Sequence, residues 1–244
     1  MNIPVPGPHG QRVLLWIGTA CALSYGLSYV FLLGFMVPPS PLLGDADVVA
    51  LYSQSNTMFR FGVGIMILTG AFFVPMSIPI SIQIARMEDG FPYLALLQIL
   101  TGLIGAWIFA WPAVLWGACA FTVERAPELT VVLHQLAWLS FVTPGSFFWM
   151  QIGAVGLVAV LSKKNDRGAA FPRWFGWATL FLAFEWSVPP TFSQMFWSGP
   201  FAWNGVITYW VTVVTYSIWL SMMMYFVFRA LRVQQEMDRS HHER

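Results

Sequence analysis

The chain has 244 residues, of which 57% are hydrophobic and only 9% are charged, and its mean hydropathy is +0.65. A soluble domain carries about 25% charged residues, so this chain has too little charge to cover a globule with solvated side chains. Its net charge of +1 comes from dispersed residues rather than from a patch, which argues against nucleic-acid binding. The composition predicts an all-α, polytopic transmembrane protein surrounded by the lipid bilayer.

Six apolar runs are each long enough for a helix that crosses a bilayer, which takes about 20 residues. In chain order, the expected spans are residues 13–36, 59–86, 92–121, 131–162, 171–195 and 204–231. They predict one six-helix transmembrane bundle over residues 1–244. Between the first two spans, residues 45–55 are expected to form an interfacial amphipathic segment that Asp45 caps.

Two pairs of spans resemble each other. Spans two and three, and spans four and five, form hairpins whose second helix opens with Phe-Pro, at residues 91–92 and 171–172. This similarity favours a parallel repeat of two helical hairpins, of the kind that some transporters contain. The alternative is coincidence, because proline is common at the first position of a helix.

The basic residues predict the orientation of the chain. If the N-terminus is cytoplasmic, ten of the twelve Lys and Arg residues lie on the cytoplasmic side, and only Arg60 and Arg125 lie on the far side. Such a bias predicts that both termini are cytoplasmic. The first apolar run starts at Val13 and is long enough to span, so it is interpreted as a retained helix rather than a cleaved signal peptide.

Glu185 is the acid of the fifth span, in the stretch FLAFEWSVPPTF. An ionised acid in the hydrocarbon region costs about 2.5–3.5 kcal/mol, so this side chain is expected to face the bundle interior and to be protonated or paired. A functional interpretation makes it a proton-exchanging group. A structural interpretation has it close a helix contact, or bond to backbone carbonyls that Pro189 and Pro190 leave without a donor.

Several other polar residues are expected at the outer depth of Glu185. They are Arg60, His134, Gln135, Gln194 and Asn204. Arg60 or His134 could pair with Glu185, and either partner would favour the ionised carboxylate while burial opposes it. With Glu185, His134 becomes a candidate proton-transfer residue. By itself it is more often a hydrogen-bonded histidine than a ligand.

Aromatic residues recur on helical faces and near prolines. The candidates for an aromatic pocket are Trp111, Trp138, Trp149, Trp177, Phe181 and Trp186. Such a pocket would suit a flat hydrophobic ligand such as a quinone, a sterol or a polyene. The alternative is ordinary bundle packing together with lipid-facing belt residues.

Several kinds of chemistry lack the residues they need. No lysine lies in a span, and His134 is the single histidine of the bundle, so a retinal Schiff base, bis-histidine haem and a histidine-rich di-iron site are set aside. Cys21 and Cys119 lie singly in apolar spans, which argues against a thiolate metal site. No metal is therefore expected, and the sequence identifies neither a cofactor nor a catalytic residue.

Five phrases of the sequence carry a resemblance. They are ALYSQSNTMFRFGVGIMILTGAFFVP, LALLQILTGLIGAWIFAWPAVLW, ELTVVLHQLAWLSFV, FPRWFGWATL and GPFAWNG. As a set they resemble a group of uncharacterised bacterial multi-pass membrane proteins of the domain-of-unknown-function type, over most of residues 45–230. The resemblance implies the six-helix layout, the interfacial segment and a bacterial cytoplasmic (inner) membrane, but it implies no activity and no functional residue.

Two classes of function follow. The preferred one is a binding or accessory subunit that holds a hydrophobic, lipid-like small molecule or a partner membrane protein, because two or three isolated polar groups are few for a transport path. The alternative is a small proton-coupled transporter or membrane enzyme that uses Glu185 with His134 or Arg60.

Overall fold

A computed structural model describes residues 7–54, 57–143, 145–163 and 169–242. Within these ranges the chain is helical and contains no strand. The helices are α1 (Pro8–Leu27), α2 (Asp45–Ser53), α3 (Thr57–Thr69), α4 (Phe73–Met87), α5 (Tyr93–Gly105), α6 (Trp107–Thr122), α7 (Pro127–Val142), α8 (Gly145–Leu161), α9 (Arg173–Glu185), α10 (Val188–Thr191) and α11 (Thr212–His242). Three shorter turns are the π-helical η1 (Ser28–Leu32) and η3 (Val206–Val211) and the 3₁₀-helical η2 (Ser193–Met195).

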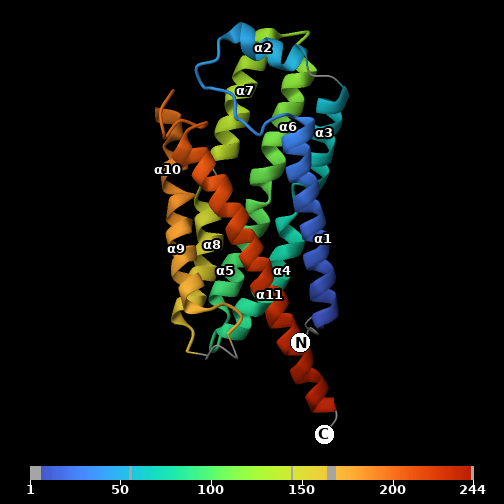
Figure 1. The fold of residues 1–244 in the computed structure, drawn as a ribbon, viewed down its shortest axis with the longest axis vertical. Helices are drawn as coiled ribbons and strands as arrows, with labels where there is room; N and C mark the ends of the chain where they lie inside the picture. The colour runs from blue at the N-terminus through green and yellow to red at the C-terminus, as the bar shows by residue number, and fades with distance from the viewer. Residues whose placement is uncertain (1–6, 55–56, 144, 164–168, 243–244) are drawn as a thin grey trace.

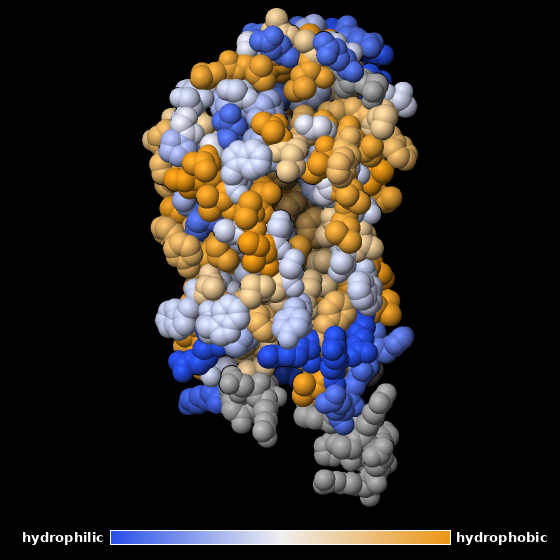
Figure 2. Space-filling model, in the orientation of Figure 1, coloured by the Kyte–Doolittle hydropathy of each residue, from blue (hydrophilic) through white to orange (hydrophobic). Residues whose placement is uncertain are grey.

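Five helical stretches are long and apolar enough to cross a membrane. They are Pro8–Leu32, Thr57–Met87, Tyr93–Thr122, Pro127–Leu161 and Val206–Glu236. Figure 2 shows hydrophobic residues gathered over the middle of one face, with hydrophilic residues at both ends. The chain is therefore a multi-pass helical membrane protein.

The fifth expected span, residues 171–195, differs from the other five. Its helix α9 has only 13 residues and is followed by the four-residue α10 and by η2. Proline explains the interruption, because Pro189 and Pro190 lack the backbone N–H that would continue the ladder of α9. This segment is thus a broken helix that is shorter than the ~20 residues a straight span needs.

Three of the long spans, Thr57–Met87, Tyr93–Thr122 and Pro127–Leu161, are broken near their middles, which divides the bundle into two tiers (Figure 1). The α3–α4 break precedes Pro75, whose ring clashes with the carbonyl four residues earlier. At the α7–α8 break, Thr143 leaves the helical region, as residues before proline do, and Gly145 adopts a left-handed φ of +68°. Pro144 itself lies outside the described residues. One tier holds α3, α6 and α7, and the other holds α4, α5, α8 and α9.

Small residues and buried polar groups join the helices within the second tier. A Cβ at Gly176 of α9 would lie 2.9 Å from the carbonyl oxygen of Gly156 in α8, so only glycine permits this close crossing. Ser81 of α4 hydrogen bonds to Gln98 of α5, and Gln98 Nε2 donates to Ser77 Oγ at 3.4 Å. The buried glutamine therefore makes the interhelical hydrogen bonds that a polar group in an apolar span requires.

Helix α2 covers the end of the bundle opposite to the two termini (Figure 1). It begins within the expected interfacial segment 45–55 and ends at Ser53, while residues 55 and 56 lie outside the described part of the chain. Its N-cap is Gly44, and no side chain caps the helix, so the expectation that Asp45 is the cap is wrong. Asp45 instead lies in the first turn, where an acid is favourable to the helix dipole.

Candidate functional site

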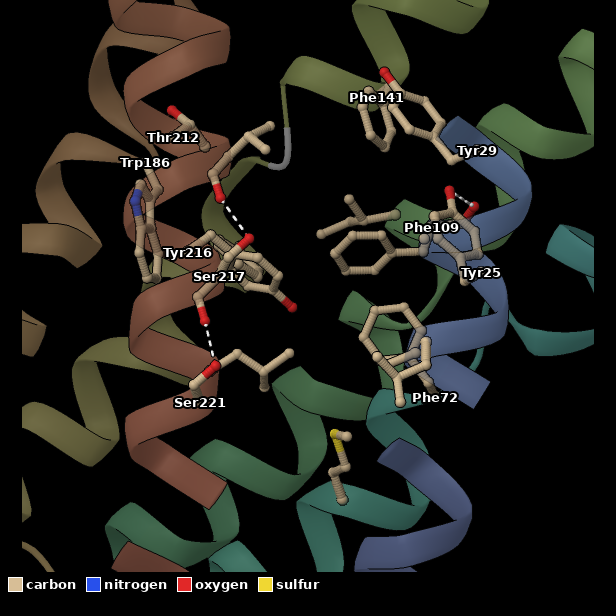
Figure 3. Close-up of a pocket in the computed structure, with 18 of the residues that line it drawn as sticks. Tyr25, Tyr29, Phe72, Phe109, Phe141, Trp186, Thr212, Tyr216, Ser217 and Ser221 are labelled. Atoms are coloured by element: carbon tan, nitrogen blue, oxygen red, sulfur yellow. Dashed lines mark hydrogen bonds between the residues drawn. The ribbon is translucent and has the colours of Figure 1, made fainter. Parts of the chain in front are cut away.

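A cavity of about 540 Å³ lies where α1, α6 and α11 face one another (Figure 3), and it opens at the surface of the bundle beside Leu23 and Val213, which are 62% and 39% exposed. Its aromatic wall residues include Tyr25, Tyr29, Phe72, Phe109, Trp186 and Tyr216. The helix breaks account for its position, because Phe72 lies in the α3–α4 break, Phe109 lies in the first turn of α6, and Trp186 directly follows α9. Where the helices are broken, their axes change direction and less chain fills the middle of the bundle. A space therefore remains between the two tiers.

Ring contacts fix the walls of the cavity on both sides. On one side, the Phe72 and Phe109 ring centroids are 4.7 Å apart, and Tyr25 meets Phe109 edge-to-face at 5.7 Å. On the other side, Trp186 and Tyr216 pack at 5.5 Å with their planes at 71°. Aromatic pairs at such separations add about 0.5–1.5 kcal/mol each to the burial of their surface. The two walls meet where the Phe109 and Tyr216 ring centroids lie 6.2 Å apart.

Most hydroxyl groups around the cavity already have hydrogen-bond partners. Tyr25 donates to the Phe109 carbonyl oxygen at 2.9 Å. The Tyr29 and Tyr209 hydroxyl oxygens lie 2.8 Å apart, and Tyr209 donates to the Phe35 carbonyl at 3.1 Å. The serine and threonine hydroxyls of the lining bond to backbone carbonyls of their own segments.

Tyr216 is the exception among these hydroxyl groups. Its hydroxyl oxygen is buried and has no hydrogen-bond partner among the described residues. Figure 3 shows the side chain leaving α11 and pointing toward the opposite wall of Phe72 and Phe109. None of the described residues that line the cavity carries a charge. The chemistry of the site is thus that of an apolar, aromatic pocket with one unsatisfied polar group.

The structure does not bring the six expected aromatic pocket residues together. Trp186 lines the cavity, with its Nε1 donating to Thr215 Oγ1 at 2.7 Å. Trp149, Trp177 and Phe181 are 47%, 61% and 67% exposed, so they point outward from the bundle. An outward position on an apolar span faces lipid, which agrees with the interpretation as belt residues.

Two further members of that set also lie away from the cavity. Trp138 is fully buried in the tier of α3, α6 and α7, where its ring packs 5.3 Å from Trp116. Trp111 is half-buried and stacks on Trp107 at 5.4 Å. Trp138 therefore serves packing between α6 and α7, while the Trp111 stack lies within α6, and neither residue lines the pocket.

The polar candidates do not form the expected pairs. Arg60 donates from Nη2 to the Ala120 carbonyl at 3.0 Å, and His134 Nδ1 lies 2.9 Å from the Tyr52 hydroxyl. Glu185 has both carboxyl oxygens buried, and neither bonds to any part of the chain that the structure describes. A hydrogen bond from Glu185 to Arg60 or to His134 is therefore not formed, and Nε2 of His134 likewise has no hydrogen-bond partner among the described residues.

The remaining polar candidates are dispersed over three segments. Gln135 is half-buried on α7, Gln194 is exposed on η2, and Asn204 is half-buried in the loop that precedes η3. None of these three belongs to the cavity lining.

The sequence analysis did not identify the tyrosines that line the cavity, although their positions in the sequence gave a signal. Tyr25 and Tyr216 lie inside apolar spans, where a phenol hydroxyl needs a partner.

The chain matches no protein-family model, no curated protein and no solved structure. Its function is therefore argued from the site. Ligand pockets measure about 300–1,000 Å³ and combine a mostly apolar lining with a small number of placed polar groups. The cavity between α1, α6 and α11 has this size and this chemistry.

Proposed function

We propose that this membrane protein binds a hydrophobic, lipid-like small molecule in the cavity between α1, α6 and α11. The observation that carries the proposal is the cavity itself, about 540 Å³ in volume, with aromatic rings on facing walls. A subunit that only supports a partner protein does not need a pocket of its own, whereas a subunit that binds a small molecule does. Of the two roles expected from the sequence, binding a small molecule and binding a partner membrane protein, we therefore propose the first.

The exposure of the lining supports occupancy. Leu23 and Val213 line the cavity and are 62% and 39% exposed, so the space opens at the apolar surface of the bundle. In a membrane, either a specific ligand or the acyl chains of surrounding lipids are therefore expected to fill it.

We also propose six crossings of a bacterial inner membrane, with both termini in the cytoplasm. Both described ends of the chain lie at the same end of the molecule (Figure 1), as an even number of crossings requires. The sixth crossing would be α9 with α10 and η2. The two far-side arginines, Arg60 and Arg125, belong to the end of the bundle that α2 covers, which supports the orientation. The proposed repeat would relate the hairpin α3–α6 to the hairpin α7–α10, since each begins with a broken helix.

One observation keeps a second function in view. The two buried carboxyl oxygens of Glu185 have no partner within the described chain, and an intramembrane acid is by default a candidate for function. A small proton-coupled transporter or membrane enzyme would use this group to exchange protons. Because neither His134 nor Arg60 is bonded to it, Glu185 would act without them.

The test of ligand binding is native mass spectrometry of the detergent-purified protein, followed by solvent extraction of any retained molecule. Gly26 lies on the cavity, and a Cβ there would meet nothing within 4 Å, so Gly26→Leu should fit and occupy the space. Gly64 has the same open surroundings on α3 but does not line the cavity, and Gly64→Leu is the matched control. We expect wild type and the control to retain a small molecule and Gly26→Leu to lose it. Equal retention by all three would exclude the cavity as the site.

A further inference from the structure

We infer that the cavity takes an acyl chain of an anionic phospholipid, whose headgroup binds to Arg12 and Arg232 at the end of the bundle where both termini lie. The chain enters sideways from the bilayer, between α1 and α11. This inference rests on the proposed function and names the ligand and its route. The observations that carry it are the opening of the cavity, the hydrogen bonds of its lining and the place of these two arginines.

The cavity opens between α1 and α11. Leu23 and Gly26 of α1 and Val213 and Ser217 of α11 all line it, and all four are exposed. Both helices belong to segments that are apolar and long enough to cross a membrane. The opening therefore faces hydrocarbon, and a molecule that enters by it comes from the bilayer rather than from water.

Contacts between the two sides close both ends of this opening. At one end, the hydroxyl oxygens of Tyr29 and Tyr209 lie 2.8 Å apart. At the other end, the ring centroids of Trp16 on α1 and Phe228 on α11 lie 5.3 Å apart. A helix rises about 20 Å between positions 16 and 29. The opening is therefore elongated along the helix axes, which suits a linear chain.

The lining offers a ligand no free hydrogen-bond donor. The hydroxyls of Thr19, Ser217 and Ser221 each donate to the backbone carbonyl four residues earlier. The hydroxyl oxygen of Tyr216 is too deeply buried for a molecule in the cavity to touch. None of the described lining residues is charged. A carbonyl or phosphate oxygen would lose its water here without gaining a partner, so the part of the ligand that enters is hydrocarbon.

Two arginines lie just beyond the end of the opening that Trp16 and Phe228 close. Arg12 is one turn before Trp16 on α1, and Arg232 is one turn after Phe228 on α11. Residues four apart share a face of a helix, and the two helices run in opposite directions (Figure 1). Both arginines therefore flank the seam between α1 and α11 at the end where the termini lie.

This pair suits the phosphate of a lipid headgroup. Arginine donates two parallel hydrogen bonds to phosphate, and basic residues at the membrane surface attract anionic lipids. Arg12 is half-buried and Arg232 is exposed, and neither has a hydrogen-bond or ion-pair partner among the described residues. The first acid beyond them on α11, Glu236, lies one turn further from the cavity. A negatively charged headgroup is therefore favoured over a zwitterionic one.

The distance from the arginines to the cavity matches the reach of an acyl chain. One leaflet contributes about 15 Å of hydrocarbon, half of the ~30 Å core. Leu23 lies about 17 Å along α1 from Arg12, and Ser221 lies equally far along α11 from Arg232. Leu23 and Ser221 both line the cavity. A chain whose headgroup is held by the arginines therefore ends inside it.

Headgroup recognition is tested with two phospholipids of identical chains, the anionic phosphatidylglycerol and the zwitterionic phosphatidylcholine. Binding to the detergent-purified protein is measured by titration in native mass spectrometry. Wild type should bind phosphatidylglycerol about 25-fold more tightly, at about 5-fold for each arginine. Arg12→Gln and Arg232→Gln should each remove about 5-fold of this preference. Arg173→Gln, at an exposed arginine that begins α9, is the matched control and should keep it.

Insertion of the chain is tested by filling the cavity. Ser221→Leu should weaken the binding of both lipids by roughly 10-fold, about the value of two displaced methylenes. Ser53→Leu on α2 is the matched control, because both serines are exposed and each hydroxyl donates to a carbonyl four residues earlier at 2.8 Å. In wild type, phosphatidylglycerol with chains half as long should also bind more weakly. That comparison decides the point if Ser221→Leu does not fold.

The contrary results are distinct. If wild type binds the two lipids equally, or if both arginine variants keep the full preference, the inference is overturned at the headgroup. If Ser221→Leu binds both lipids as wild type does, or if shortened chains bind as tightly as long ones, it is overturned at the chain. Either result leaves the proposed function standing when wild type retains a molecule that Gly26→Leu loses. If wild type retains no molecule and binds neither lipid, the proposed function and the inference both fail.

Discussion

The hydroxyl of Tyr52 on α2 lies 2.9 Å from Nδ1 of His134 on α7, in a buried hydrogen bond between residues 82 positions apart. Tyr52 is fully buried, and its ring meets the His134 ring edge-on at 5.7 Å. Burial raises the pKa of Tyr52 well above its ordinary value, and the neighbouring Cys119 raises it further. The phenol therefore keeps its proton, and this bond fastens α2 to the end of the bundle.

Tyr52→Phe should loosen α2 without unfolding the bundle. The change leaves Nδ1 of His134 buried without this partner, which costs about 1–3 kcal/mol. Hydrogen–deuterium exchange should rise in residues 45–53 and stay unchanged in α8. Tyr93→Phe is the control, because Tyr93 is 71% exposed at the start of α5. Unaltered exchange in α2 would show that the bond does not hold this helix in place.

Tyr216→Phe should raise the thermal stability of the ligand-free protein. The wild-type hydroxyl is buried without a described partner, and removing such a group recovers its desolvation cost of about 1–3 kcal/mol. Tyr25→Phe should act in the opposite direction and cost about 1 kcal/mol, because it removes the bond to the Phe109 carbonyl. Melting curves of extensively delipidated samples measure both effects. A loss of stability in both variants would mean that Tyr216 has a structural partner.

Gly70→Ala should destabilise the junction of the two tiers. A Cβ at this position would lie 2.9 Å from Cα and 3.0 Å from the backbone nitrogen of Ala110 in α6. Backbone atoms cannot yield as a flexible side chain does, so overpacking here should cost about 1–3 kcal/mol. Gly64→Ala, which meets nothing within 4 Å, should be neutral or stabilising by up to about 1 kcal/mol. Equal melting temperatures for the two variants would contradict the close approach of α6.

Glu185→Gln should separate the structural interpretation of this acid from the functional one. Neither carboxyl oxygen has a described hydrogen-bond partner, so the neutral amide of the same shape should alter the unfolding free energy by less than about 1 kcal/mol. If Glu185 exchanges protons, pH-driven proton uptake by reconstituted vesicles should disappear in the variant at unchanged expression. A variant that no longer folds would show instead that the carboxyl braces the helix end.

The sequence determined the membrane class, five of the expected spans and the presence of a short helix between the first two of them. The bilayer imposes these features directly, because a span needs ~20 apolar residues and every backbone group must be bonded within a helix. The broken form of the fifth span could also be read in part, since Pro189 and Pro190 follow Glu185 closely. Apolar residues suit both the lipid-facing side and the inward-facing side of a membrane helix. The spans can therefore be predicted without knowing how the helices pack.

Only the tertiary structure decided which residues face inward. Trp177 and Trp186 lie in the same apolar run, yet Trp177 is 61% exposed and Trp186 is fully buried beside the cavity. In a soluble helix a polar face would distinguish the two positions, but lipid is as apolar as a protein core, so the hydrophobic pattern carries no such information. The pairing of Tyr52 with His134 and the isolation of Glu185 are likewise set by which helices become neighbours, because single polar groups find partners only when the bundle has packed.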